Sequence, residues 1–174
     1  SSDLPGAAAL KPEMNFPSDE PFGIPALLPE MLAPLPEPID VWAGPDASDA
    51  DWAGWWLYCY GSDSMRGLDL TRTVLAFYTD DYRFERLWKD PAPVAQTGAV
   101  AAAEVNFTVT DQYPAAMALY QTYRKRWLAR YWQSLGLRIF VDLNVGEQHR
   151  ETNLLGVPSG WAAWITRGYT KQLD

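Results

Sequence analysis

One apolar run that ends in two adjacent carboxylates and continues directly as a helix constrains this fold more than any other stretch. Residues 74–79 are apolar or β-branched, Asp80 and Asp81 follow, and Phe84, Leu87 and Trp88 then recur at helical spacing. Continuous apolar runs are typical of strands that are covered on both faces, as in parallel sheets. Polar groups directly after such a strand lie at the carboxyl edge of the sheet, where ligands bind in α/β proteins.

The same alternation of strand and helix continues along the chain. Further strands are expected within residues 55–60, 99–109, 137–145 and 161–166, and helices from 81 to about 89 and from 114 to 135. Gly136 is expected to cap the long helix, and a loop is expected before the last strand. This order predicts right-handed crossovers and an α/β fold with a mainly parallel sheet, of which a portion of a (β/α) barrel is one form.

The first 46 residues have a different composition. They contain ten of the fourteen prolines, a density that neither a helix nor a central strand tolerates. Apolar residues such as Phe16, Ile24 and Leu27 are too frequent for a purely solvating tail. We therefore divide the chain into an extended Pro-rich arm, residues 1–46, and a single α/β domain, residues 47–174. The arm is expected to dock on its own domain or on a neighbouring subunit, and a flexible tail is the alternative.

The net charge of −8 is concentrated at the front of the chain. Residues 1–63 carry eleven Asp and Glu against one Lys, whereas residues 64–174 carry eleven against thirteen Lys and Arg. The arm is therefore acidic and the domain is close to neutral. No apolar stretch reaches the length of a transmembrane helix, so we expect a soluble, non-secreted protein without a membrane partner.

The chain has one cysteine and one histidine. Cys59 lies among aromatic residues and is expected to be a buried thiol that acts as a small hydrophobic group. His149 lies in a polar stretch and is expected in a solvated loop. A single cysteine and a single histidine argue against a Cys/His zinc site, which needs several such ligands, and against a Ser-His-Asp triad.

Four strand ends should bring polar side chains to one edge of the sheet. The candidate catalytic residues are Asp80, Asp81 and Asp142, and the candidate binding residues are Asn106, Thr108, Asn144 and Arg167. Adjacent carboxylates serve as an acid/base pair, or they hold a divalent cation that relieves their repulsion, here at Asp80 and Asp81. No other cofactor is expected. The alternative for Asp81 is that it only caps the following helix.

The long helix offers a second candidate site, for nucleic acid. Arg124, Lys125, Arg126 and Arg130 alternate with aromatic residues, a pattern that suits phosphates and stacked bases. The alternative, which we favour, is that the aromatic residues form the buried stripe and the cations form a solvated face. The overall acidity also opposes nucleic-acid binding.

The central part of the chain resembles a known family. The resemblance rests on the stretch Asp80-Asp81-Tyr82-Arg83-Phe84-Glu85 with Trp88, on Tyr123-Arg124 followed by Arg130-Tyr131-Trp132-Gln133 and Gly136, and on the Gly156-Val157-Pro158 turn. They are similar to a domain of unknown function, number 4417, found in phages and mobile elements, over roughly residues 70–168. The resemblance implies a protein of the host cytoplasm or of the virion, and it carries no established activity.

Three functional hypotheses follow, and whether the protein is an enzyme stays open among them. The first is an interaction or assembly module whose arm, residues 1–46, docks on a protein partner or a second copy. The second is a carboxylate-dependent hydrolase or glycosyl-transfer enzyme that acts on a nucleotide- or sugar-like substrate. The third is a nucleic-acid-binding factor for replication or segregation. We rank the first slightly ahead, because catalytic residue types are scarce and the arm is apolar.

Overall fold

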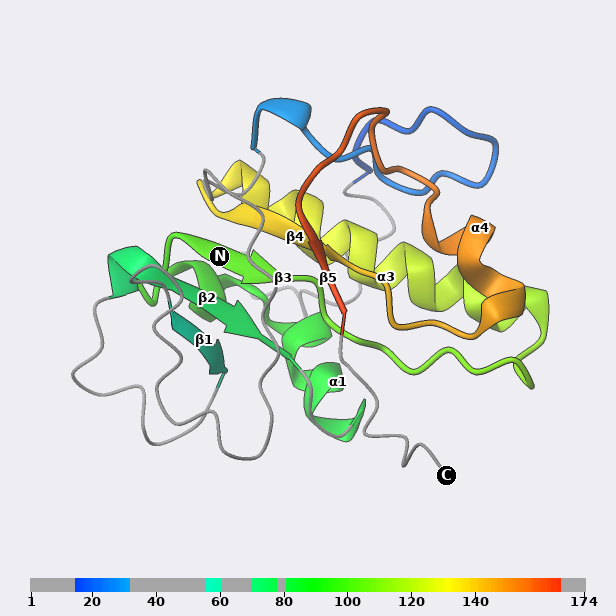
Figure 1. Ribbon diagram of the computed structural model, residues 1–174, viewed down its shortest axis with the longest axis horizontal. Helices are drawn as coiled ribbons and strands as arrows, with labels where there is room; N and C mark the ends of the chain where they lie inside the picture. Colours follow the sequence, from blue (N-terminus) through cyan, green and yellow to red (C-terminus); the bar gives the residue numbers. More distant parts are fainter. Residues whose placement is uncertain (1–14, 32–55, 61–69, 78–80, 167–174) are drawn as a thin grey trace, which may run out of the picture.

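Five strands form a parallel sheet in the computed structural model, which describes residues 15–31, 56–60, 70–77 and 81–166 (Figure 1). Every neighbouring pair of strands is parallel. The strands lie in sequence order, as β1 (Trp56–Cys59), β2 (Thr73–Ala76), β3 (Ala101–Ala103), β4 (Arg138–Asp142) and β5 (Trp164–Ile165). The predicted α/β fold with a mainly parallel sheet is confirmed.

The strand order has no reversal, which distinguishes it from doubly wound sheets. In those sheets ligands bind where the order reverses, whereas consecutive strands in sequence order are typical of (β/α) barrels. The carboxyl ends of β3, β4 and β5 therefore still share one edge. The site expected from the sequence belongs to that edge and not to a switch point.

Helices connect β2 to β3 and β3 to β4. The pair α1 (Asp81–Lys89) and α2 (Ala92–Ala95) lies between β2 and β3, and α3 (Ala115–Ser134) lies between β3 and β4. The predicted bounds of α1 and α3 are confirmed to within a residue. Helix α2 was not predicted, because Asp90-Pro91 reads as a helix stop. Proline is also well suited to the first turn of a helix, so the same residues end α1 and begin α2.

The connection between β4 and β5 is helical where a loop was expected. It contains a short 3₁₀ helix, η5 (Glu147–His149), and α4 (Arg150–Asn153), which packs against α3. His149 is consequently buried, and the prediction of a solvated histidine is wrong. The prediction of a buried thiol is also wrong, since Cys59 is exposed at the end of β1, an edge strand of the described sheet.

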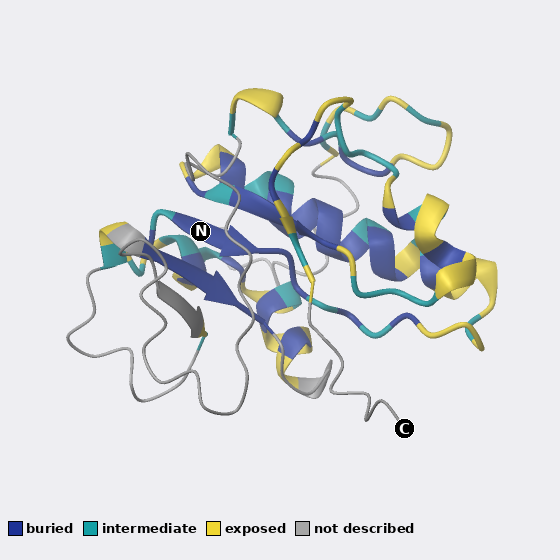
Figure 2. Ribbon diagram, viewed as in Figure 1, coloured by how far each residue is buried: buried dark blue, intermediate teal, exposed yellow. Residues whose placement is uncertain are grey.

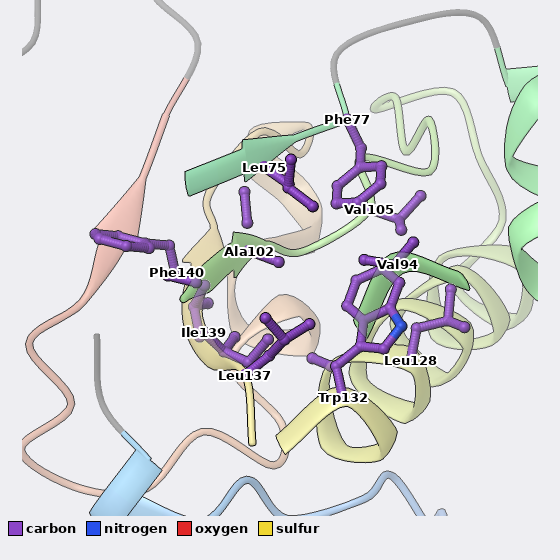
Figure 3. Packing of buried hydrophobic residues seen from close by; sticks show 14 of the residues in the cluster. Leu75, Phe77, Val94, Ala102, Val105, Leu128, Trp132, Leu137, Ile139 and Phe140 are labelled. Carbon is purple, nitrogen blue, oxygen red and sulfur yellow. The ribbon is translucent and has the colours of Figure 1, made fainter. Parts of the chain in front are cut away.

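The long helix α3 occupies the centre of the domain. Its residues from Gln121 to Gln133 are buried almost without interruption (Figure 2). Trp132 stacks on Phe77 with ring centroids 5.3 Å apart, and its indole donates a hydrogen bond to the Pro91 carbonyl. Figure 3 shows this cluster between the sheet and the helices. Among the described residues, no helix has the length and apolar character needed to cross a membrane.

Two features let α3 sit close to the sheet. Strand β3 consists of three buried alanines, Ala101–Ala103, whose small side chains leave room for the helix. Gly136 has a φ of 94° and follows the last turn, where Leu137 N donates to the Trp132 carbonyl at 3.0 Å. The expected C-terminal cap is confirmed, and it turns the chain directly into β4.

Part of the Pro-rich arm is described. We call residues 15–31 the strap; the segment includes η2 (Pro29–Met31) and runs along α3 and the loop after α4 (Figure 1). Ile24 and Leu27 are buried, and the Phe16 ring lies 5.3 Å from that of Trp127. The strap therefore packs on its own domain. The rest of the arm lies outside the described residues.

Candidate functional site

The predicted site residues are only partly within the described structure. Asp80 and Arg167 lie outside it, and Asp81 begins α1 without a described side chain. The acid pair and the cation proposed for it therefore remain predictions. The structure describes the other four edge residues, which follow β3 or lie at or just after the end of β4: Asn106, Thr108, Asp142 and Asn144.

Asp142 is the centre of this edge. It is the last residue of β4 and is completely buried. Its Oδ1 accepts hydrogen bonds from the backbone and side-chain nitrogens of Asn144, at 3.2 and 2.6 Å. In the amide orientation that satisfies both groups, Asn106 Nδ2 donates to Asp142 Oδ2 at 3.1 Å. The structure thus brings Asn106, Asp142 and Asn144 together.

The two strands beside β4 contribute differently. Thr166, directly after β5, donates through its hydroxyl to Asn144 Oδ1 at 3.3 Å. The Thr108 carbonyl accepts a hydrogen bond from Gln121 on α3, so Thr108 is tied to the helix by its backbone. The carboxyl edge of the described sheet is therefore continuous from β3 to β5.

A second buried carboxylate, Glu104, was missed by the sequence reasoning. It follows β3 directly and is 1% exposed. Arg126 Nη1 lies 2.7 Å from both of its carboxylate oxygens, and the Asp142 backbone nitrogen donates to Glu104 Oε1 at 3.1 Å. Glu104 therefore joins β3, β4 and α3. An acid directly after an alanine-rich strand was the available signal.

Three consecutive cations of helix α3 each pair with a different carboxylate. Arg124 Nη1 lies 2.6 Å from Glu85 on α1, and Lys125 Nζ lies 3.5 Å from Asp142 Oδ2. Arg126 pairs with Glu104. Successive residues of a helix point about 100° apart, so three consecutive cations reach three different elements. We call these six residues the charge hub: Glu85, Glu104, Arg124, Lys125, Arg126 and Asp142.

The expected solvated basic face is wrong for three of its four residues. Arg124, Lys125 and Arg126 are buried because the sheet, α1, α4 and the strap surround α3. A buried cation needs a partner, since leaving it unpaired costs several kcal/mol. Arg130 is only partly buried; its guanidinium lies 4.8 Å from the Phe16 ring centroid, and Nη1 bonds Ser134.

The charge hub is also tied to α4. Asn153 Nδ2 donates to the Asp142 carbonyl at 2.9 Å, while Arg126 donates to the Leu155 carbonyl at 3.0 Å and to the Asn153 carbonyl. Burial lowers the pKa of Lys125 below its usual value, and the nearby charges of Asp142 and Glu104 partly oppose that shift. The Lys125 side chain is thus almost completely buried next to Asp142.

The chemistry open to this edge is limited by burial. Glu104 and Asp142 have almost no exposed surface through which to exchange a proton with a substrate, and cations and amides already occupy their oxygens. Within the described part of the chain, no group of three or more His, Cys, Asp and Glu side chains is arranged to hold a metal ion. The observed geometry is that of an internal tie between the sheet and α3.

The chain is similar to proteins of two mycobacteriophages, which fits a phage protein. It is 40% identical to the Gene 1 protein of Mycobacterium phage D29 over 68 residues, and 41% identical to the Gene 1 protein of Mycobacterium phage L5 over 70 residues. Each match covers 38% of this chain, but only 25% and 30% of the respective relative. No solved structure matches the chain. The model of the family described as a domain of unknown function, DUF4417, matches residues 63–172, and the chain therefore belongs to that family.

Proposed function

We propose that this chain is an interaction module of a phage protein, which binds a protein partner through the surface around its strap. The main support for the proposal is that the charged groups at the carboxyl ends of β3 and β4 are not accessible to a substrate. Glu104, Asp142 and their cations are buried and paired with one another. They hold α3 against the sheet, which leaves the outer surface to provide the function.

The strap gives that surface its apolar character. Its inner residues, Ile24 and Leu27, are buried in the domain, while Phe22 is 61% exposed. Leu154, in the loop against which the strap packs, is 45% exposed. Exposed apolar groups on a firmly held segment are typical of protein contact sites.

The other two hypotheses draw no support from the described residues. The enzyme hypothesis needs Asp142 at an accessible site, and this side chain has no exposed surface. The nucleic-acid hypothesis needs a solvated basic face, and three of the four cations named for it are buried in ion pairs.

Affinity capture followed by reconstitution tests the proposal. Tagged full-length chain is incubated with a lysate of mycobacterial cells infected with the phages whose proteins resemble it. Each captured protein is then purified and titrated against the chain, and light scattering measures the oligomeric state of the chain alone. We expect saturable binding to a purified protein, or a defined oligomer. A monomer that binds none of the purified candidates would contradict the proposal.

A further inference from the structure

A closed loop, residues 17–26, projects from the strap. The Ala26 nitrogen donates to the Pro17 carbonyl at 2.8 Å and closes the loop. Inside it, the Glu20 carboxylate accepts hydrogen bonds from the Phe22 nitrogen at 2.6 Å and the Ile24 nitrogen at 2.5 Å. Prolines at 17, 21 and 25 fix further backbone angles. The loop therefore has one well-determined conformation.

The base of the loop is locked to the domain. Ile24 is 1% exposed, and Pro25 is also buried. The Leu27 nitrogen donates to the Gly156 carbonyl at 2.9 Å, and a Cβ at Gly156 would lie 2.3 Å from the Pro25 carbonyl oxygen. This close backbone contact holds the base of the loop against the segment that follows α4.

This rigid loop displays an aromatic ring to solvent. Phe22 is the most exposed large apolar side chain among the described residues, at 61%. Single exposed apolar residues are ordinary on protein surfaces. Phe22 differs because its backbone nitrogen donates a hydrogen bond to the Glu20 carboxylate. The loop is also anchored on both sides, by Phe16 against Trp127 before it and by the buried Ile24 after it. Little backbone freedom remains to be lost when such a ring is bound, which raises its contribution to affinity.

We propose that Phe22 is the anchor of a contact with a protein partner, in which its ring enters an apolar pocket whose rim carries Lys or Arg. This inference rests on the proposed function and specifies its partner. The rim follows from charge: the strap carries Asp19, Glu20 and Glu30 and no Lys or Arg, and Asp19 is exposed. The same charge opposes a second copy of the loop and an anionic lipid surface.

Site-specific photo-crosslinking of the full chain tests the anchor. A benzophenone amino acid replaces Phe22 in one protein and Met117 in a control, since Met117 is 48% exposed on a different element. The protein that crosslinks from position 22 is purified and titrated against wild type, Phe22→Ala, Met117→Ala and Glu20→Ala. Thermal melting of each variant reports its folding.

We expect Phe22→Ala to weaken binding roughly thirtyfold, as hot-spot truncations do, with an unchanged melting temperature. Met117→Ala should bind like wild type. Glu20→Ala should weaken binding less than Phe22→Ala, because it frees the loop but keeps the ring. Higher salt should weaken binding of wild type, because the rim is cationic.

Equal affinity of Phe22→Ala and wild type would overturn the inference and leave the proposed function intact. Crosslinking from position 22 only to a second copy, or co-sedimentation with anionic vesicles in place of a protein, would also overturn it. The same holds if the full chain binds a purified partner that crosslinks only from position 117. If no partner of any kind binds, both proposals fail.

Discussion

Replacing Glu104 by glutamine tests whether the charge hub holds the domain together. In the native domain Arg126 Nη1 lies 2.7 Å from both carboxylate oxygens, and both side chains are completely buried. The amide in Glu104→Gln keeps the volume and one acceptor oxygen for the Asp142 nitrogen. It removes the negative charge and leaves the Arg126 guanidinium without a counter-ion.

The expected cost is large for a domain of this size. Removing one partner of a buried ion pair costs roughly 3–5 kcal/mol, because the remaining charge is neither solvated nor paired. Domains of this kind are stable by only about 5–15 kcal/mol in total. Glu104→Gln should therefore remove a large part of the free energy of unfolding, and urea denaturation followed by tryptophan fluorescence measures it.

Glu85→Gln is the matched control. This variant makes the same chemical change at Glu85, the partner of Arg124, and the Glu85 side chain is 52% exposed. Solvent screens that pair, so the control should cost only about 0–1 kcal/mol. A double variant, Glu104→Leu with Arg126→Met, removes both buried charges and should recover part of the loss. If Glu104→Gln costs no more than Glu85→Gln, or the double variant costs the sum of its single changes, the buried ion pair does not hold the domain together.

Three further predictions concern the hub and the strap. The pKa of Lys125 is lowered in the folded state, so the unfolded chain binds more protons between that pKa and about 10.5. Wild type should therefore gain stability relative to Lys125→Met as the pH rises through this window, and parallel stability curves would contradict the shift. Gly156→Ala should destabilise the domain more than Gly160→Ala, because both have positive φ (80° and 78°) but only Gly156 would meet the strap; equal melting temperatures would show that no such clash exists. Leu27→Ala should cost about 2–5 kcal/mol and speed proteolysis within residues 15–31, whereas Phe22→Ala should leave the cleavage rate unchanged.

The sequence identified the elements because their signals are local. The apolar run before Asp80 predicted β2, the spacing of Phe84, Leu87 and Trp88 predicted α1, and Gly136 marked the end of α3. Neighbouring strands joined by helices then predicted the parallel sheet. Helix α2 was not predicted, because the Asp90-Pro91 dipeptide was interpreted only as the end of α1, whereas it also precedes the start of α2.

The candidate site was harder to predict, because burial depends on partners that are distant in the sequence. From the sequence alone, the cations Arg124 to Arg126 were assigned to the solvent side of the helix, opposite its aromatic stripe. Their partners Glu85 and Glu104 lie 39 and 22 residues away, on other elements. Asn106, Asp142 and Asn144 were placed correctly at one edge, since strand polarity alone determines where strand ends lie.

The ion pairs of the charge hub join α3 to three other elements, and this arrangement sets the rotation of α3 about its own axis. Aromatic contacts such as Phe77 on Trp132 bury area but tolerate small rotations of the helix, because dispersion forces depend weakly on direction. Ion pairs that join α3 to three different elements do not tolerate such rotations of the helix, because a rotation that shortens one pair lengthens another. We infer that Arg124, Lys125 and Arg126 set the rotation of α3 relative to α1, β4 and β3. That rotation also fixes Trp127 and Gln133, which contact Phe16 and Leu28 of the strap. The buried charges thus determine where the strap lies and how it presents its outer surface.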